Sequence, residues 1–188
     1  MPTPKEKKDN KIIGRGKTIR LVKAKEEDYI LDQTKDNYRV VDEVIEQIVK
    51  ALGFGDIQCD RFTDVNGANR VLGAVFFNSV ANSAFEADWS ESTFDNVNPP
   101  FVFFLRCVLL CELARLKNPQ YNCLLWMQGT GEEFKSFVAK EDGKWRLVGA
   151  FMKGFKLFTR PTVHPFKRKR LAPIELTNNT YVFTLNGP

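Results

Sequence analysis

Residues 41–53, VDEVIEQIVKALG, carry the clearest structural signal in the chain. Six apolar residues recur there at spacings of three and four: Val41, Val44, Ile45, Ile48, Val49 and Leu52. This is the period of one face of an α-helix. Gly53 follows at the point where a helix favours a left-handed residue. We therefore predict a helix over residues 41–52 that packs its apolar face onto a core.

Two stretches farther along the chain also have a helical pattern. One face of a helix would collect apolar and small residues, namely Ala68, Val71, Leu72, Val75, Phe76 and Ser79. Pro100 suits the first position of another helix, which Pro119 would end. Its residues are apolar nearly all round. We expect a helix over residues 68–79, and a second one after Pro100 that forms the centre of the core.

Strand patterns follow these helices. Residues 121–129, YNCLLWMQG, indicate a buried strand, and residues 180–185, TYVFTL, a final short one. Residues 134–152 predict a hairpin about Asp142-Gly143, because Asp-Gly favours the type I′ turn. The expected fold class is α+β, a single compact domain with helices in the N-terminal half and antiparallel strands in the C-terminal half.

The expected domain organisation is a basic flexible arm over residues 1–25 and a single domain over residues 26–188. The 188 residues, 43% of them hydrophobic, suffice for one sizeable core. The arm is polar and contains Pro2, Pro4, Gly14 and Gly16, so we expect it to be mobile.

Charge is strongly segregated along the chain. The formal net charge is +5, but residues 1–25 carry +7, residues 153–170 carry +7 and the body between them carries −8. Two basic segments that flank an acidic body are informative about partners, because such segments attract polyanions.

Several classes of protein are disfavoured. The N-terminus lacks the apolar core of a secretory signal, and the longest apolar run, FVFFLRCVLLCELA, is shorter than the roughly 20 residues of a membrane span. We expect a soluble intracellular protein, in the cytoplasm or nucleus, with no membrane span. Cys107 and Cys111 have no second close pair, so buried reduced thiols are favoured over zinc. We expect neither a metal nor a cofactor.

No enzymatic motif is convincing. Gly16-Lys17-Thr18 ends like a phosphate-binding loop, but position 11 is Lys where that loop needs Gly. The only histidine, His164, lies among cations that disfavour its protonated form. Carboxylates are plentiful without a diagnostic spacing. We therefore expect no enzyme, although a deep pocket holding acids of perturbed pKa would favour one.

Residues 151–170, FMKGFKLFTRPTVHPFKRKR, combine cations with aromatic rings. Cations neutralise phosphates, and aromatic faces stack on unpaired bases. In the alternative interpretation the Phe residues face a strand's core and the Lys residues are its solvated side. The candidate nucleic-acid-binding residues are the basic Lys5, Lys7, Lys8, Lys11, Arg15, Lys17, Arg20, Lys153, Lys156, Arg160, Lys167, Arg168, Lys169 and Arg170, and the aromatic Phe155, Phe158 and Phe166.

These features favour a non-enzymatic nucleic-acid-binding protein that coats or packages a genome, with RNA favoured weakly over DNA. In layout only, a basic arm before a compact body rich in Phe and Asn resembles small viral coat or nucleocapsid proteins. That resemblance implies self-association around a genome and a place in a virion. Residues 167–170, KRKR, can also serve as a nuclear import signal. The alternative is then a nuclear-imported adaptor or regulatory protein that binds a protein partner by its acidic body. A weaker alternative is attachment to an anionic membrane.

The KRKR block allows a first test. If Lys167 to Arg170 contact phosphates, changing all four to Ala should reduce the salt slope of nucleic-acid binding by about three to four units. The slope is measured from dissociation constants over a range of salt concentrations. An unchanged slope with lost affinity would assign the block to folding instead.

Overall fold

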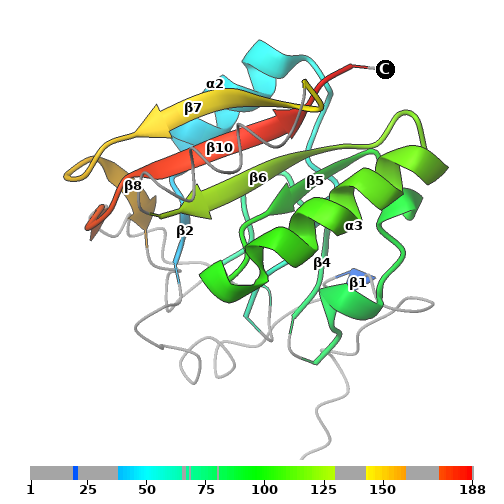
Figure 1. The fold of residues 1–188 in the computed structure, drawn as a ribbon. Helices are drawn as coiled ribbons and strands as arrows, with labels where there is room; N and C mark the ends of the chain where they lie inside the picture. Colours follow the sequence, from blue (N-terminus) through cyan, green and yellow to red (C-terminus); the bar gives the residue numbers. More distant parts are fainter. Residues whose placement is uncertain are drawn as a thin grey trace, which may run out of the picture.

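The fold is seen in a computed structural model that describes residues 38–64, 67, 69–79, 81–129, 143–159 and 174–187, together with the backbone of Ile19 and Arg20 (Figure 1). The described residues form a seven-stranded sheet, a three-stranded sheet and two α-helices. The helices are α2 (Asp42–Leu52) and α3 (Phe104–Lys117), and the short 3₁₀ turns are η2 (Ala84–Glu86), η3 (Trp89–Glu91) and η4 (Phe101–Phe103). The strands are β1 (Ile19–Arg20), β2 (Arg39–Val40), β3 (Cys59–Asp60), β4 (Phe76–Phe77), β5 (Phe94–Val97), β6 (Asn122–Gln128), β7 (Trp145–Phe151), β8 (Lys156–Thr159), β9 (Ile174–Glu175) and β10 (Thr180–Leu185).

The large sheet is mixed. Its strand order is β1-β4-β3-β5-β6-β10-β7, and the four neighbours β4, β3, β5 and β6 run parallel. β10 is antiparallel to both β6 and β7. The small sheet, β2-β8-β9, is antiparallel. α3 connects the parallel neighbours β5 and β6, as crossover helices do.

The two helices cover opposite faces of the sheet, with α3 in front and α2 behind (Figure 1). Alternate residues of β6 belong to two separate clusters. Cys123, Leu125 and Met127 join the α3 cluster, while Leu124 and Trp126 join the α2 cluster. Burial on both faces explains why residues 121–129 are almost continuously apolar, and it confirms the predicted buried strand.

The predicted helix over residues 41–52 is confirmed as α2. Ile45 and Ile48 are buried on the face that the spacing indicated. Gly53 ends the helix in the left-handed conformation, with φ of 67°, and its N–H donates to the carbonyl of Val49. Asp42 and Glu43 in the first turn and Lys50 in the last complement the helix dipole.

The helix predicted after Pro100 is present, but its expected burial all round is wrong. Pro100 precedes the 3₁₀ turn η4, and α3 then runs to Lys117, just before the predicted stop. One side of α3 is buried through Phe104, Cys107, Val108, Cys111 and Ala114. The other side exposes leucines, with Leu105 at 70% and Leu109 at 61%.

The helix predicted over residues 68–79 is wrong. The described part of this range forms turns that lead into β4. Gly67 and Gly73 have φ of 66° and 90°, which a right-handed helix excludes. The amide of Val71 donates to the Asp60 carboxylate, and those of Val75 and Phe76 both donate to the Gln58 carbonyl. These longer-range hydrogen bonds replace the local ones of a helix.

The predicted strand over residues 180–185 is confirmed as β10, and β7 occupies the second half of the predicted hairpin. The first half, residues 134–142, lies outside the described residues. The expected layout by halves differs from the structure, because β2 to β5 precede α3. Within the predicted arm, the backbone of Ile19 and Arg20 pairs with β4, and the rest of the arm lies outside the described residues. No helix in the described ranges is long and apolar enough to cross a membrane.

A bulge in β7 leaves no room for a side chain at Gly149. Val182 pairs with Gly149 and Phe183 pairs with Leu147, so Val148 is the extra residue. A Cβ atom on Gly149 would lie 3.1 Å from a methyl of Val182 and 3.2 Å from the ring of Phe151. Two core side chains would therefore have to move.

We expect Gly149→Ala to lower the free energy of unfolding by about 1–3 kcal/mol, as overpacked core sites do. Urea denaturation followed by tryptophan fluorescence measures this loss. Gly187→Ala is the matched control, since nothing lies within 4 Å of a Cβ there. Equal stability of both variants would contradict the packing described at the bulge.

Candidate functional site

The β7–β8 turn, Met152 to Lys156, holds the candidate binding residues that the structure describes most fully. The amide of Phe155 donates to the Met152 carbonyl at 3.0 Å, and Gly154 has φ of 90°, which is typical of a type II turn. The Asn179 side chain accepts from the Lys153 amide at 2.9 Å. The Gly154 amide donates to the Leu176 carbonyl at 2.8 Å. Strand and turn partners thus fix this backbone on several sides.

The side chains of this turn project outward. Phe155 is 45% exposed, and Lys153 and Lys156 on either side of it are exposed too. One side of the Phe155 ring is supported by Phe151, with ring centroids 5.1 Å apart. Phe151 in turn stacks on the buried Trp126 at 6.1 Å. A half-exposed aromatic ring, supported from below by two others, therefore lies in the same turn as two exposed cations.

Phe158 is buried, unlike Lys153, Phe155 and Lys156, the other candidates whose side chains the structure describes. It is 4% exposed, belongs to the α2 cluster and contacts Tyr38 with ring centroids 4.9 Å apart. Its ring is therefore covered by the core, as the alternative interpretation of the Phe pattern anticipated. For Arg20 only the backbone, in β1, is described. The remaining candidates lie outside the described residues: Lys5, Lys7, Lys8, Lys11, Arg15, Lys17, Arg160, Phe166, Lys167, Arg168, Lys169 and Arg170.

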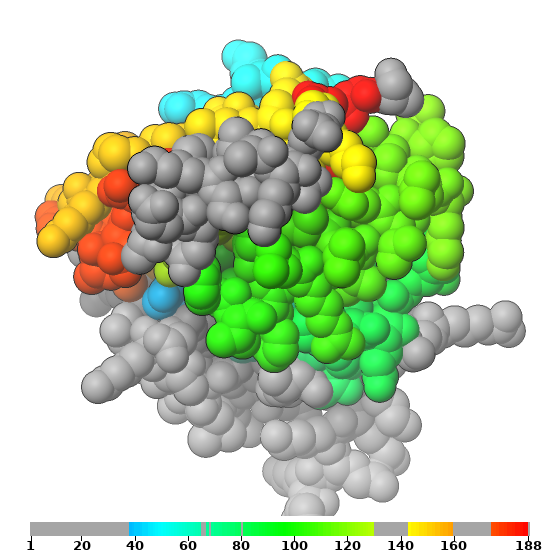
Figure 2. Space-filling view, in the orientation of Figure 1, coloured from blue at the N-terminus to red at the C-terminus, as the bar shows by residue number. Residues whose placement is uncertain are grey.

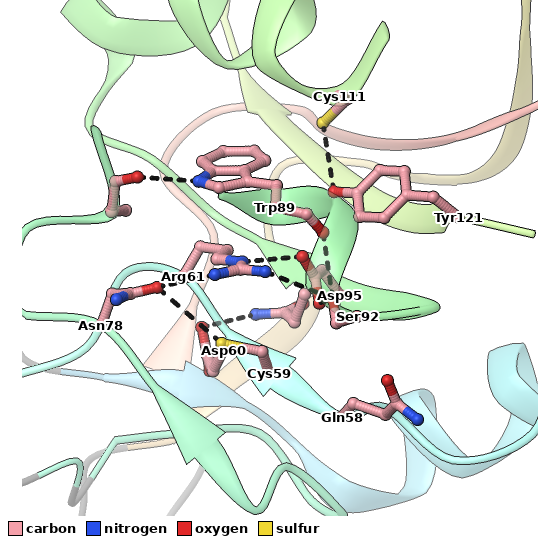
Figure 3. A network of polar contacts seen from close by, with 12 residues as sticks. Gln58, Cys59, Asp60, Arg61, Asn78, Trp89, Ser92, Asp95, Cys111 and Tyr121 are labelled. Atoms are coloured by element: carbon pink, nitrogen blue, oxygen red, sulfur yellow. Dashed lines mark hydrogen bonds and ion pairs between the residues drawn. The ribbon is translucent and has the colours of Figure 1, made fainter. Parts of the chain in front are cut away.

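A buried ion pair lies at the centre of the parallel strands (Figure 3). The Nε atom of Arg61 donates to the Asp95 carboxylate at 2.7 Å, and both side chains are fully buried. The other guanidinium nitrogens donate to the side chains of Asn78 at 3.0 Å and Ser92 at 3.2 Å. Ser92 also donates a short hydrogen bond to Asp95. Burial is the largest single effect on Arg61 and lowers its pKa. The Asp95 carboxylate and weaker interactions with Cys59 and Tyr121 together outweigh burial, so the Arg61 pKa lies above its ordinary value.

Asp60, next to this ion pair, is a second buried carboxylate. Its oxygens accept hydrogen bonds from the amides of Val71 and Phe62 and from the side-chain amide of Asn96. Asn96 in turn accepts from the indole of Trp126 at 2.8 Å. Burial raises the pKa of Asp60 to about 7, although these hydrogen bonds lower it in part.

A cavity of about 600 Å³ lies where the parallel strands end. Ligands of α/β sheets bind outside the carboxyl ends of their strands. Here the segments after β3, β4 and β5 and the end of β6 supply the walls. The described aromatic lining is Tyr38, Phe62, Phe85, Phe101, Phe103, Phe104 and Trp126, and the described amides are Asn69, Asn98 and Gln128.

The cavity and the β7–β8 turn lie at the same end of the sheet. Thr180 of β10 pairs with both Gln128, which lines the cavity, and Phe151, which precedes the turn. Neighbouring strands are about 4.8 Å apart, so β6 and β7 are separated by roughly 10 Å. One extended ligand could reach both places.

The carboxylates of raised pKa are not part of the cavity wall. Burial raises the pKa of both Asp60 and Asp95, whereas the described acid that lines the cavity is Asp64. The Arg61 guanidinium is committed to Asp95, Asn78 and Ser92. A deep pocket and a perturbed acid thus both exist without forming one acid–base site. The aromatic side chains of the described walls suit the face of a planar ring, and the amide side chains can form hydrogen bonds with its edge.

The four cysteines are free and buried, which confirms the prediction of buried thiols. Among the described residues, no group of three or more His, Cys, Asp and Glu side chains could hold a metal ion.

Sequence reasoning missed both the ion pair and the cavity. Asp60 and Arg61 are adjacent, but Asp95 and Asn78 are distant in sequence, and only the parallel pairing of β3, β4 and β5 brings them together. The residues after these strands offered a signal, since polar side chains that follow buried strands gather at one edge of a parallel sheet. That signal required the strands β3 and β4, each of two residues, to be recognised first.

No protein-family model matches this chain, and no curated protein matches it. Any function assigned to it therefore rests on the chemistry of its own residues.

The buried carboxylate makes a pH dependence testable through Asp60→Asn. The unfolded pKa is 3.8 and the folded pKa is about 7, so the wild-type protein is increasingly penalised as pH rises between these values. The Asn variant does not titrate there. We expect the unfolding free energy of wild type, minus that of the variant, to fall by roughly 2–4 kcal/mol from pH 4 to pH 8.

Urea denaturation of both proteins at several pH values measures this difference. Asp56→Asn, at an exposed position, controls for the loss of one negative charge. A wild-type-minus-variant difference that stays constant with pH would show that Asp60 has the same pKa in the folded and unfolded states.

Proposed function

We propose that the protein is a non-enzymatic nucleic-acid-binding protein that coats or packages single-stranded nucleic acid, with RNA favoured. The observation that carries this proposal is the β7–β8 turn, which presents exposed Phe155 between exposed Lys153 and Lys156. A supported aromatic face stacks on a base of any identity, and the flanking ammonium groups neutralise phosphates. This combination suits a binder that follows a backbone without reading sequence.

The charge distribution supports the same proposal. The turn begins the basic segment 153–170, and residues 1–25 carry an equal charge of +7. Each phosphate contact releases counterions, so two such segments strengthen binding without a shaped pocket. We propose that Arg160 and Lys167 to Arg170 extend the contact that the turn begins.

The cavity is compatible with this function. Its aromatic walls and amides suit an unstacked base, which can be hydrogen-bonded on its edge and packed on its face. A strand that crosses Lys153 and Lys156 would pass the end of the sheet where the cavity lies. We propose that at least one base of such a strand enters it.

Coating also calls for contacts between copies of the chain, and we propose that the protein self-associates. The viral coat or nucleocapsid role, with the protein in the virion, the cytoplasm or the nucleus, is part of the same proposal. The second candidate is the nuclear-imported adaptor, which the KRKR block favours.

Size-exclusion chromatography at two wavelengths, before and after nuclease and high salt, separates these candidates. The purified protein should elute with nucleic acid that salt releases, and it should then rebind a fluorescent single-stranded RNA. Failure to bind RNA or single-stranded DNA after the wash would reject the proposal. Mislocalisation on removal of KRKR would then support the adaptor.

The turn itself is tested with Phe155→Ala. We expect this variant to bind single-stranded RNA about 5- to 150-fold more weakly, because a lost stacking contact is worth about 1–3 kcal/mol. The double variant Lys153→Ala/Lys156→Ala should instead lower the salt slope by about 1.4. Fluorescence anisotropy at several salt concentrations measures both.

Met152→Ala is the matched control, because Met152 is 50% exposed in the same turn but has no aromatic face. It should bind like wild type. Wild-type affinity of Phe155→Ala would contradict a role for the turn in stacking.

A further inference from the structure

α3 presents a continuous apolar stripe on the surface. Its members come from α3 and the preceding turn, and all are more than half exposed: Val102 (80%), Leu105 (70%), Leu109 (61%), Leu113 (54%) and Leu116 (80%). Figure 2 shows the green surface of this segment at the centre of the visible face. Scattered exposed leucines are ordinary, but a stripe along a whole helix marks an interaction surface.

The spacing of the stripe is symmetric. From Val102 to Leu116 the intervals are three, four, four and three residues, so the pattern reads alike in both directions from Leu109. Two copies of α3 packed antiparallel about a two-fold axis at Leu109 would place Leu109 opposite its own copy. Leu105 would then lie beside Leu113, and Val102 beside Leu116. An isologous contact requires this kind of self-complementarity.

The charges beside the stripe complement each other in the same arrangement. A groove of about 230 Å³ runs along the C-terminal half of α3, and its walls include Glu86, Asp88, Leu113 and Lys117. The Lys117 ammonium pairs with Asp88 at 3.2 Å, so the net negative charge of this groove is that of Glu86. Arg106 is exposed on the same side of α3 but in its N-terminal half, where its guanidinium lies 4.0 Å from the ring centre of Phe85. The two-fold operation would bring Arg106 of the second copy to this groove. Helical side chains lean toward the N-terminus of their own helix, so the Arg106 side chain of the second copy would extend farther along the groove.

We propose that the apolar face of α3 is a homodimer interface, with a second copy packed antiparallel across Leu109 and its Arg106 seated beside Glu86 in this groove. The inference deepens the self-association in the proposed function, which coating requires. It is nevertheless tested without nucleic acid, so failure of the dimer and failure of RNA binding are distinguishable.

Cysteine cross-linking tests the register. Packed helix axes lie 8–10 Å apart, so the Cα atoms of facing residues fall near the distance that a disulfide spans. In nuclease-treated protein, Leu109→Cys should therefore cross-link to itself under mild oxidation. Leu105→Cys alone should not, since its copies would lie about 12 Å apart along the helix. Leu105→Cys mixed with Leu113→Cys should form the heterodimer.

The background in this experiment is low because the four native cysteines are free and buried. Absence of a Leu109→Cys dimer, or equally efficient cross-linking of Leu105→Cys alone, would overturn the proposed register. Multi-angle light scattering of wild type should independently give the mass of a dimer, and a monomer at all accessible concentrations would overturn the interface.

A charge reversal tests the groove. We expect Leu109→Glu to weaken the dimer about 30-fold or more, as loss of a central interface residue does. Arg106→Glu should also weaken it, and the double variant Arg106→Glu/Glu86→Arg should regain dimerisation. Lys50→Glu, on the exposed side of α2, is the matched control and should dimerise normally. Dimerisation of Leu109→Glu at wild-type strength would reject the proposal, and so would a double variant that fails to recover while remaining folded by circular dichroism.

Discussion

The buried ion pair between Arg61 and Asp95 is the interaction on which the parallel part of the sheet depends. β3 and β4 have only two residues each, so their backbone ladders contribute few hydrogen bonds. Arg61 follows β3, Asp95 lies in β5 and Asn78 follows β4, and one guanidinium joins all three. Breaking such a pair by removing one partner typically costs about 3–5 kcal/mol, because the other charge stays buried alone. Side-chain contacts here hold neighbouring strands together, as the backbone hydrogen bonds of longer strands do in other sheets.

This constraint also shapes the cavity. The network occupies the interior between the short strands, and Trp89 covers it, with the Arg61 guanidinium carbon 5.3 Å from its ring centre. The segments that leave β3, β4 and β5 then diverge from the sheet and line the cavity. The charged residues of the described cavity wall are Arg61, which is paired with Asp95, and Asp64. The rest of the described wall is mainly aromatic, amide and hydroxyl in character. A planar, weakly charged group fits such a site better than an anion does.

The sequence predicted those elements whose pattern is local. α2 has a complete helical stripe with a glycine stop, and β6 and β10 have apolar runs of strand length, so each was found. Residues 68–79 have an equally regular helical spacing, but Asp60 and Gln58 capture the amides that a helix would use. Those partners are recognisable only once β3 is in place. For the candidate site, the sequence located the cations and Phe155, while the burial of Phe158 and the cavity depend on how the two sheets and the parallel strands assemble.

α3 and the β7–β8 turn together constrain how an assembly could be built. The β7–β8 turn lies at the end of the sheet where α3 begins (Figure 1). Phe151, just before the turn, and Gln128, the last residue of β6, both pair with Thr180 of β10. α3, in contrast, ends near the start of β6. An antiparallel α3 pair would therefore hold its two basic turns at opposite ends. A two-fold contact closes on itself, so it yields dimers and not filaments. Continuous coating would then come from the nucleic acid itself, which would link the turns of successive dimers. Such an assembly should separate into dimers as the salt concentration rises. The phosphate contacts weaken with salt, whereas the apolar contact between the helices does not.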